Sequence, residues 1–95
     1  MTAAISVEAA RRDGDGMRCM VHVQSRSYDV GVSDATAQQL APQVGVEELV
    51  RESFVFLLER EPAESIMSRF DLPVIARYFP EYPREISRRL HRAGA

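Results

Sequence analysis

The sequence predicts an α+β fold, in which an N-terminal antiparallel β-hairpin is followed by a mostly α-helical C-terminal two-thirds with one long central helix. Apolar and polar residues alternate along residues 17–33, which is the period of two half-buried strands. Along residues 46–60 apolar residues recur at intervals of three and four, which is the period of an amphipathic helix. Prolines then divide residues 62–83 into short segments.

The domain organisation is expected to be simple. Residues 1–16 contain little apolar periodicity and are predicted to be a flexible leader, and residues 17–95 a single small α+β domain. With 45% hydrophobic and 27% charged residues, the chain has the composition of an ordinary globular protein. It has neither a run of ~20 apolar residues nor the pattern of a secretory signal. We therefore expect a cytoplasmic protein that does not enter a membrane.

The expected hairpin turns at Ser25-Arg26, or through a four-residue loop over residues 24–27 in the same register. Its inward pairs are then Val23 with Tyr28, Val21 with Val30, and Cys19 with Val32. His22 would lie opposite Asp29 on the outward face. We interpret this pair as an exposed cross-strand contact, because no nucleophile accompanies it.

The helical part begins with a short helix over residues 35–41, for which Asp34 is the expected cap. The long helix follows Gly45. Further helices are expected over residues 62–70, over the segment after Asp71, and from residue 83 to about 93. The last of these has few apolar residues and is expected to be peripheral.

Val55 and Phe56 fall outside the apolar stripe of the long helix and widen its apolar surface. Either later helices cover them, or a second chain does. The second alternative predicts a protein partner or a homodimer, with Val55, Phe56, Glu52 and Glu59 as the partner-binding residues.

The residue types needed for catalysis do not occur in a recognisable pattern. The glycines form no phosphate-binding loop, and His22 and His91 lie in different segments without further ligands at metal-binding spacing. The single cysteine, Cys19, fits a small buried side chain better than a nucleophile. We expect no catalytic residues, no metal and no cofactor. One alternative remains, a ligand site at the proline-aromatic corner Tyr78–Tyr82.

Charge is divided along the chain. The net charge is −2, and most of the excess acid lies in residues 47–82, whereas the C-terminal segment is basic. Candidate phosphate contacts are Arg84, Arg88, Arg89 and Arg92. A nucleic-acid-binding protein usually has a broader basic surface, so binding to nucleic acid is a less favoured expectation.

Residues 28–60, YDVGVSDATAQQLAPQVGVEELVRESFVFLLER, follow the order strand, short helix, glycine-containing turn, long helix. This order resembles the ribbon-helix-helix fold of small bacterial repressors and antitoxins. The resemblance implies a strand that pairs with its twin across a dimer and reads the DNA major groove. Residues 53–83, SFVFLLEREPAESIMSRFDLPVIARYFPEYP, are also similar to a group of small uncharacterised bacterial proteins, a similarity that implies no activity.

The function expected from the sequence is that of a small non-enzymatic protein-interaction module of an antitoxin-like or accessory-subunit type. A DNA-binding regulator of ribbon-helix-helix type is the first alternative. A small ligand-binding protein or enzyme with a site near Tyr78–Tyr82 is the second.

Overall fold

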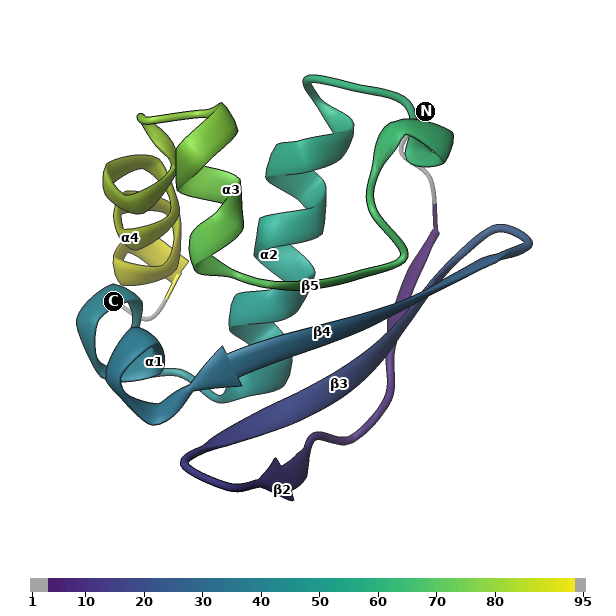
Figure 1. The fold of residues 1–95 in the computed structure, drawn as a ribbon. Coiled ribbons are helices and arrows are strands. Elements are labelled where there is room, and N and C mark those ends of the chain that lie inside the picture. The colour runs from purple at the N-terminus through teal and green to yellow at the C-terminus, as the bar shows by residue number, and fades with distance from the viewer. Residues whose placement is uncertain (1–3, 94–95) are drawn as a thin grey trace.

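A mixed β-sheet carries a layer of helices on one of its faces (Figure 1). The computed structural model describes residues 4–93, and their side chains as far as residue 90. The strands are β1 (Ile5–Val7), β2 (Arg11–Asp13), β3 (Gly16–Val23), β4 (Arg26–Ser33) and β5 (Arg69–Asp71). The helices are α1 (Asp34–Leu40), α2 (Val46–Leu58), the short 3₁₀ helix η1 (Ala63–Ser65), α3 (Pro73–Tyr78) and α4 (Tyr82–Ala93).

The molecule is α+β, but the predicted arrangement of an N-terminal hairpin followed by a mostly α-helical C-terminal two-thirds is wrong. The hairpin β3–β4 is the middle of a five-stranded sheet within the described residues, in the order β1-β3-β4-β5, with β2 also paired to β3. Strands β1 and β2 lie in the expected leader, and β5 lies where a helix was expected. Each is only three residues long, which is too short for an alternating pattern to stand out in a sequence.

The hairpin register also differs from the prediction. The turn residues are Gln24 and Ser25, and Val21 pairs with Tyr28, so that each strand is displaced by two residues along its partner. A displacement of two keeps every side chain on the same face, so alternation alone cannot distinguish the two registers. The observed register pairs eight residues on each strand, from Gly16 opposite Ser33 to Val23 opposite Arg26.

The outer edge of the sheet is tied to α2 by side chains. The backbone N–H of Ala10, between β1 and β2, donates to Glu47 Oε2 at 2.8 Å. Arg51 Nη1 donates to the Ile5 carbonyl oxygen at 2.7 Å. Both helix residues therefore satisfy backbone groups that an edge strand would otherwise leave open to another chain.

The long helix starts at Val46, as its apolar pattern predicts, and packs its buried side against the sheet. Phe54 lies between Tyr28 and Phe70, with ring centroids 5.1 and 6.1 Å away. The cap of α1 is Ser33 and not Asp34, because the Ser33 hydroxyl accepts from the N–H of Thr36. Within the described residues, no helix is long and apolar enough to cross a membrane.

The last helix is not peripheral, although its sequence is highly polar. Its apolar residues Ile86 and Leu90 are fully buried, together with Tyr82 at its start. The helix packs on α2, and the Ser87 hydroxyl donates to the carbonyl oxygen of Leu40 at the end of α1. A single narrow apolar stripe is therefore sufficient to seat α4 between two neighbouring helices.

Candidate functional site

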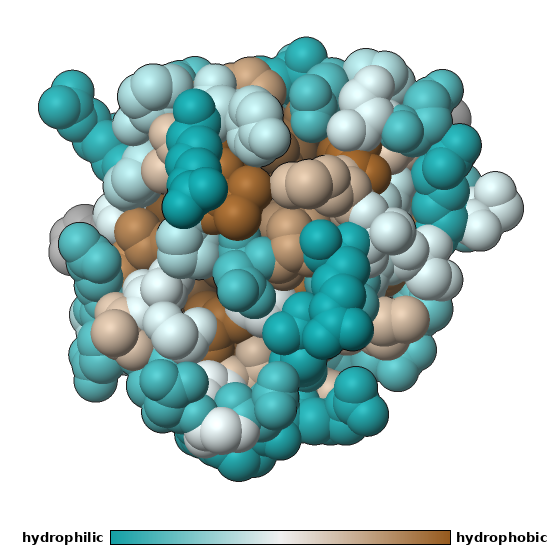
Figure 2. Space-filling view, in the orientation of Figure 1, coloured by the Kyte–Doolittle hydropathy of each residue, from teal (hydrophilic) through white to brown (hydrophobic). Residues whose placement is uncertain are grey.

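A groove opens where the end of α2, the η1–β5 segment and α3 meet. We call it the α3 groove, and it has a volume of about 220 Å³. Its lining residues are Leu57, Glu61, Ser65, Ile66, Met67, Phe70, Val74, Ile75, Tyr78 and Phe79. Figure 2 shows apolar atoms exposed in this region, between α3 and the η1–β5 segment.

The walls of the α3 groove follow from local sequence. Helix α2 ends at Leu58, and Pro62 has an extended backbone that cannot continue the helix. The chain then runs through η1 into the extended strand β5. Pro73 then occupies the first turn of α3, where its missing N–H costs no hydrogen bond. Val74 and Tyr78 are four residues apart and therefore lie on one side of this helix.

Among the described residues, two large apolar side chains are exposed to solvent, and both line the α3 groove. The exposed fractions are 45% for Met67 and 68% for Tyr78. Their neighbours Ile66 and Phe70 are buried in the core. An exposed apolar concentration of this kind in a concave place is typical of a binding surface.

The lining of the α3 groove contains one charged residue, and it is acidic. This residue, Glu61, forms no ion pair with a described residue, and neither does the exposed Glu64 of η1. The nearby Glu59 and Glu81 differ, because Arg60 contacts both carboxylates, at 3.3 and 3.2 Å. Two carboxylates without an ion pair among the described residues therefore lie on the α2–η1 side of the groove.

The proline-aromatic corner is divided between this groove and the core. Tyr78 and Phe79 line the groove, whereas Tyr82 is buried against Phe56, with ring centroids 5.3 Å apart. Burial raises the pKa of Tyr82 to about 12, although its hydrogen bond with Ser53 acts in the opposite direction. The structure therefore does not bring Tyr82 to a common site with Tyr78.

The residues predicted to bind a partner on the long helix are not an exposed apolar patch. Phe56 is fully buried, since Phe79 and Tyr82 pack on its ring and the guanidinium carbon of Arg60 lies 3.6 Å from the ring centroid. Val55 and Glu52 are half-buried. Glu59 is exposed but engaged with Arg89 at 2.7 Å, and this hydrogen bond lowers the pKa of Glu59. The later helices cover the surplus apolar width at Phe56.

Two of the four arginines of the basic C-terminal segment have carboxylate partners. Arg88 Nη2 lies 2.8 and 2.7 Å from the two carboxylate oxygens of Glu85, and Arg89 bridges Glu85 and Glu59. These arginines hold the pKa of Glu85 at about 2. Arg84 is exposed on α4, and the side chain of Arg92 lies outside the described residues.

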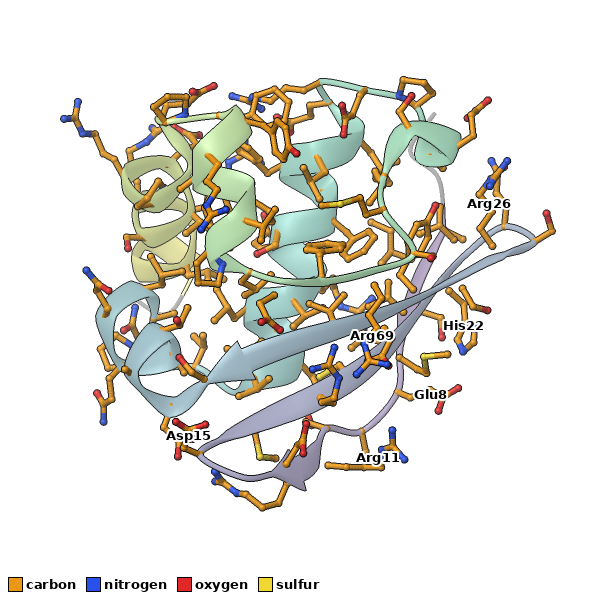
Figure 3. The ribbon with its side chains drawn as sticks, in the orientation of Figure 1. Glu8, Arg11, Asp15, His22, Arg26 and Arg69 are labelled. Atoms are coloured by element: carbon orange, nitrogen blue, oxygen red, sulfur yellow. The ribbon has the colours of Figure 1, made fainter. Side chains whose placement is uncertain are left out.

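The face of the sheet without helices carries polar contacts that the predicted register did not anticipate. His22 lies opposite Ser27, with Nδ1 2.9 Å from its hydroxyl, and its Nε2 lies 2.6 Å from Glu8 Oε2. Figure 3 shows Glu8 beside His22 on this face. Asp29 instead accepts from Arg18 Nε at 2.7 Å. The α3 groove does not include any of these groups.

Strand β4 has partners on both edges over Asp29–Gly31. It pairs with β3 on one edge and in parallel with β5 on the other. The symmetric strand pairing of a ribbon-helix-helix dimer needs one of those edges free.

Among the side chains described, no group of three or more His, Cys, Asp or Glu residues is placed to hold a metal ion.

Met67 was absent from the sequence-based candidates, because residues 62–70 were expected to form a helix with Ile66, Met67 and Phe70 on one apolar side. Residues 66–71 are instead non-helical, running from η1 into β5, and this segment buries Ile66 and Phe70 and leaves Met67 exposed.

Comparison of the chain with models of protein families, with curated proteins and with solved structures found no match.

Proposed function

We propose that this chain is a small non-enzymatic protein-interaction module, and that the α3 groove receives the partner. The observation that carries the proposal is that Met67 and Tyr78, the two large exposed apolar side chains of the described residues, line one groove. Exposed aromatic and methionine side chains are enriched at the centres of protein interfaces. The module would act in the cytoplasm, as an antitoxin-like protein or an accessory subunit.

The dimensions of the α3 groove favour a side chain over a free small molecule as its occupant. Sites for small ligands usually have volumes of ~300–1,000 Å³ and combine apolar walls with several convergent polar groups. The α3 groove has about 220 Å³, and its lining contains few polar side chains. A ligand-binding or enzymatic role for the Tyr78–Tyr82 corner is for this reason the weaker candidate.

A DNA-binding role has less support than a protein-binding role. Arg88 and Arg89 already have carboxylate partners, which phosphates would have to replace. On the uncovered sheet face, Arg18 is similarly engaged with Asp29. The two occupied edges of β4 also argue against the strand pairing that the family resemblance implies.

Affinity capture with matched variants tests the proposal. Immobilised wild-type chain and the Tyr78→Ala and Met67→Glu variants are exposed to lysate of the host cell, and retained proteins are identified by mass spectrometry. Both substitutions are at exposed positions, so circular dichroism should show an unchanged fold. We expect a partner that the wild type retains and both variants lose. Equal retention by the variants would contradict docking at the α3 groove.

A control substitution is available on the same helix. Arg77 precedes Tyr78, is exposed and does not line the α3 groove. Arg77→Ala should leave capture of the partner unchanged. Light scattering of the purified chain should be run in parallel, because a dimer that Tyr78→Ala dissociates would identify a second copy as the occupant.

A further inference from the structure

The α3 groove has room for one large apolar side chain. An engineered cavity of about 150 Å³ in another protein accommodates benzene, so about 220 Å³ is sufficient for a Phe, Leu or Met side chain. Leu57, Phe70 and Ile75 provide its apolar wall. Such an anchor would be a residue on a peptide segment, since the groove is open to solvent on one side.

The charge beside the α3 groove selects among such segments. Glu61 lies in the lining and Glu64 follows within η1, and neither has an ion-pair partner among the described residues. Arg60, the nearest arginine in sequence, is engaged elsewhere, with Glu81 and over the ring of Phe56. An acidic border of this kind attracts a basic segment and repels an acidic one.

A second copy of this chain fits the groove poorly. Its own large exposed apolar side chains, Met67 and Tyr78, already belong to the α3 groove, so two copies would have to meet groove to groove. A two-fold axis there would bring the Glu61 and Glu64 side chains of both copies to one interface. Like charges juxtaposed at an interface disfavour association.

We propose that the α3 groove binds a peptide segment of a different protein, in which one large apolar residue is accompanied within about one helical turn by Lys or Arg. The apolar residue fills the groove beside Met67 and Tyr78. The basic residue lies over the α2–η1 side, against Glu61 and Glu64. This inference rests on the docking function proposed above and adds the chemistry of the partner.

Selection from a random peptide library displayed on phage tests this chemistry without knowledge of the natural partner. The wild-type chain is the bait, and binders that also bind Tyr78→Ala are removed. We expect the remaining peptides to share a large apolar residue with a nearby Lys or Arg. A selected peptide, labelled with a fluorophore, then provides dissociation constants by anisotropy.

The charge is tested with variants that keep the shape of the side chain. Glu61→Gln combined with Glu64→Gln should weaken binding of the selected peptide about threefold to tenfold at low salt, and added salt should narrow this difference. Glu48→Gln is the matched control, since Glu48 is an exposed glutamate at the opposite end of α2. It should leave the dissociation constant unchanged.

The outcomes separate the two proposals. Peptides that need Tyr78 but show no enrichment of Lys or Arg, and bind equally to the Glu61→Gln/Glu64→Gln variant, would overturn the inference and leave the docking function standing. If every peptide that bound the wild type also bound Tyr78→Ala, so that none remained after depletion, the docking function itself would fail. A groove-dependent homodimer in the bait would overturn the inference in favour of a second copy.

Discussion

The hydroxyl oxygen of Tyr82 lies 2.7 Å from Ser53 Oγ, deep between α4 and α2. Ser53 Oγ also lies 2.8 Å from the carbonyl oxygen of Leu49, to which it donates its single proton. In the hydrogen bond between Tyr82 and Ser53, the Tyr82 hydroxyl must therefore be the donor. Since both side chains are buried, this chain of two hydrogen bonds is a buried polar connection between the central helix and the last one.

The direction of these bonds predicts an asymmetry between two substitutions. Ser53→Ala leaves the buried Tyr82 hydroxyl without an acceptor and should lower the free energy of unfolding by about 1–3 kcal/mol. Tyr82→Phe should cost less, about 1 kcal/mol, because Ser53 still donates to Leu49. The double variant should cost less than the sum of the two, as urea unfolding can measure. Strict additivity would contradict the hydrogen bond.

The buried Tyr82 also predicts how stability depends on alkaline pH. The pKa of its phenol is about 12 in the folded chain, against about 10 when unfolded. Below pH 10 both states hold the proton and the stabilisation is fully present. Between pH 10 and 12 the unfolded state loses its proton first, so stability should fall by ~2–3 kcal/mol in total. Urea unfolding across this range measures the decline.

Tyr82→Phe is the control for this pH dependence. Cys19 and Tyr28 also have pKa values raised by burial, so some alkaline decline should persist in the variant. The difference between the two proteins isolates Tyr82. If the wild type and Tyr82→Phe lost stability in parallel from pH 10 to 12, the phenol would not be held in its protonated form by burial.

Periodicity predicted the central parts of the fold and failed at short elements. The start of α2 at Val46 and the inward side of β3 follow from patterns that extend over two or more turns or several strand residues. Strand β5 contains one apolar residue, Phe70, and its pairing with β4 depends on residues about forty positions earlier in the chain. A strand stabilised by such distant pairing leaves almost no local signal.

The candidate site was only partly predictable for a related reason. The aromatic corner drew attention to Tyr78 and Phe79, which line the α3 groove, but the same pattern included Tyr82, which is buried. For Phe56 the sequence left two alternatives open, cover by a partner or by the later helices, and Phe79 and Tyr82 cover it. Which apolar residue remains exposed depends on how α3 and α4 pack, and that is not visible in the period of a single helix.

The turn between β3 and β4 predicts a stabilising substitution. Gln24 has a φ of 57°, a conformation that costs a residue with a Cβ roughly 1–2 kcal/mol and costs glycine little. Gln24→Gly should therefore raise the free energy of unfolding by about 0.5–1 kcal/mol. Ser25→Gly should lower it by a similar amount, because Ser25 has no positive φ to relieve. Urea unfolding of both variants tests the expectation, and a gain from Ser25→Gly would contradict this turn geometry.

The links from α2 to the sheet edge predict local opening without global unfolding. Glu47→Ala removes the acceptor for the Ala10 N–H, a charge-assisted hydrogen bond that also lowers the pKa of Glu47. Hydrogen exchange at the Ala10 amide should accelerate about tenfold or more, since such bonds contribute roughly 1.5–3 kcal/mol. Exchange at the amides of α4 should hardly change. Arg51→Ala should likewise free the Ile5 carbonyl and accelerate exchange along β1.

The matched controls decide whether these carboxylate and guanidinium contacts are the cause. Glu48→Ala alters the neighbouring exposed glutamate and should leave exchange at Ala10 as in the wild type. Glu47→Gln keeps an oxygen acceptor and should give an intermediate rate. As the pH falls from the ordinary pKa of glutamate through the lowered pKa of Glu47, the wild-type contact should lose its stabilisation, because the carboxylate takes up a proton more readily when the contact is open. Protection of the Ala10 amide, corrected for the intrinsic exchange rate, should fall over this range. Unchanged exchange in Glu47→Ala would mean that β3 alone holds the edge strand in place.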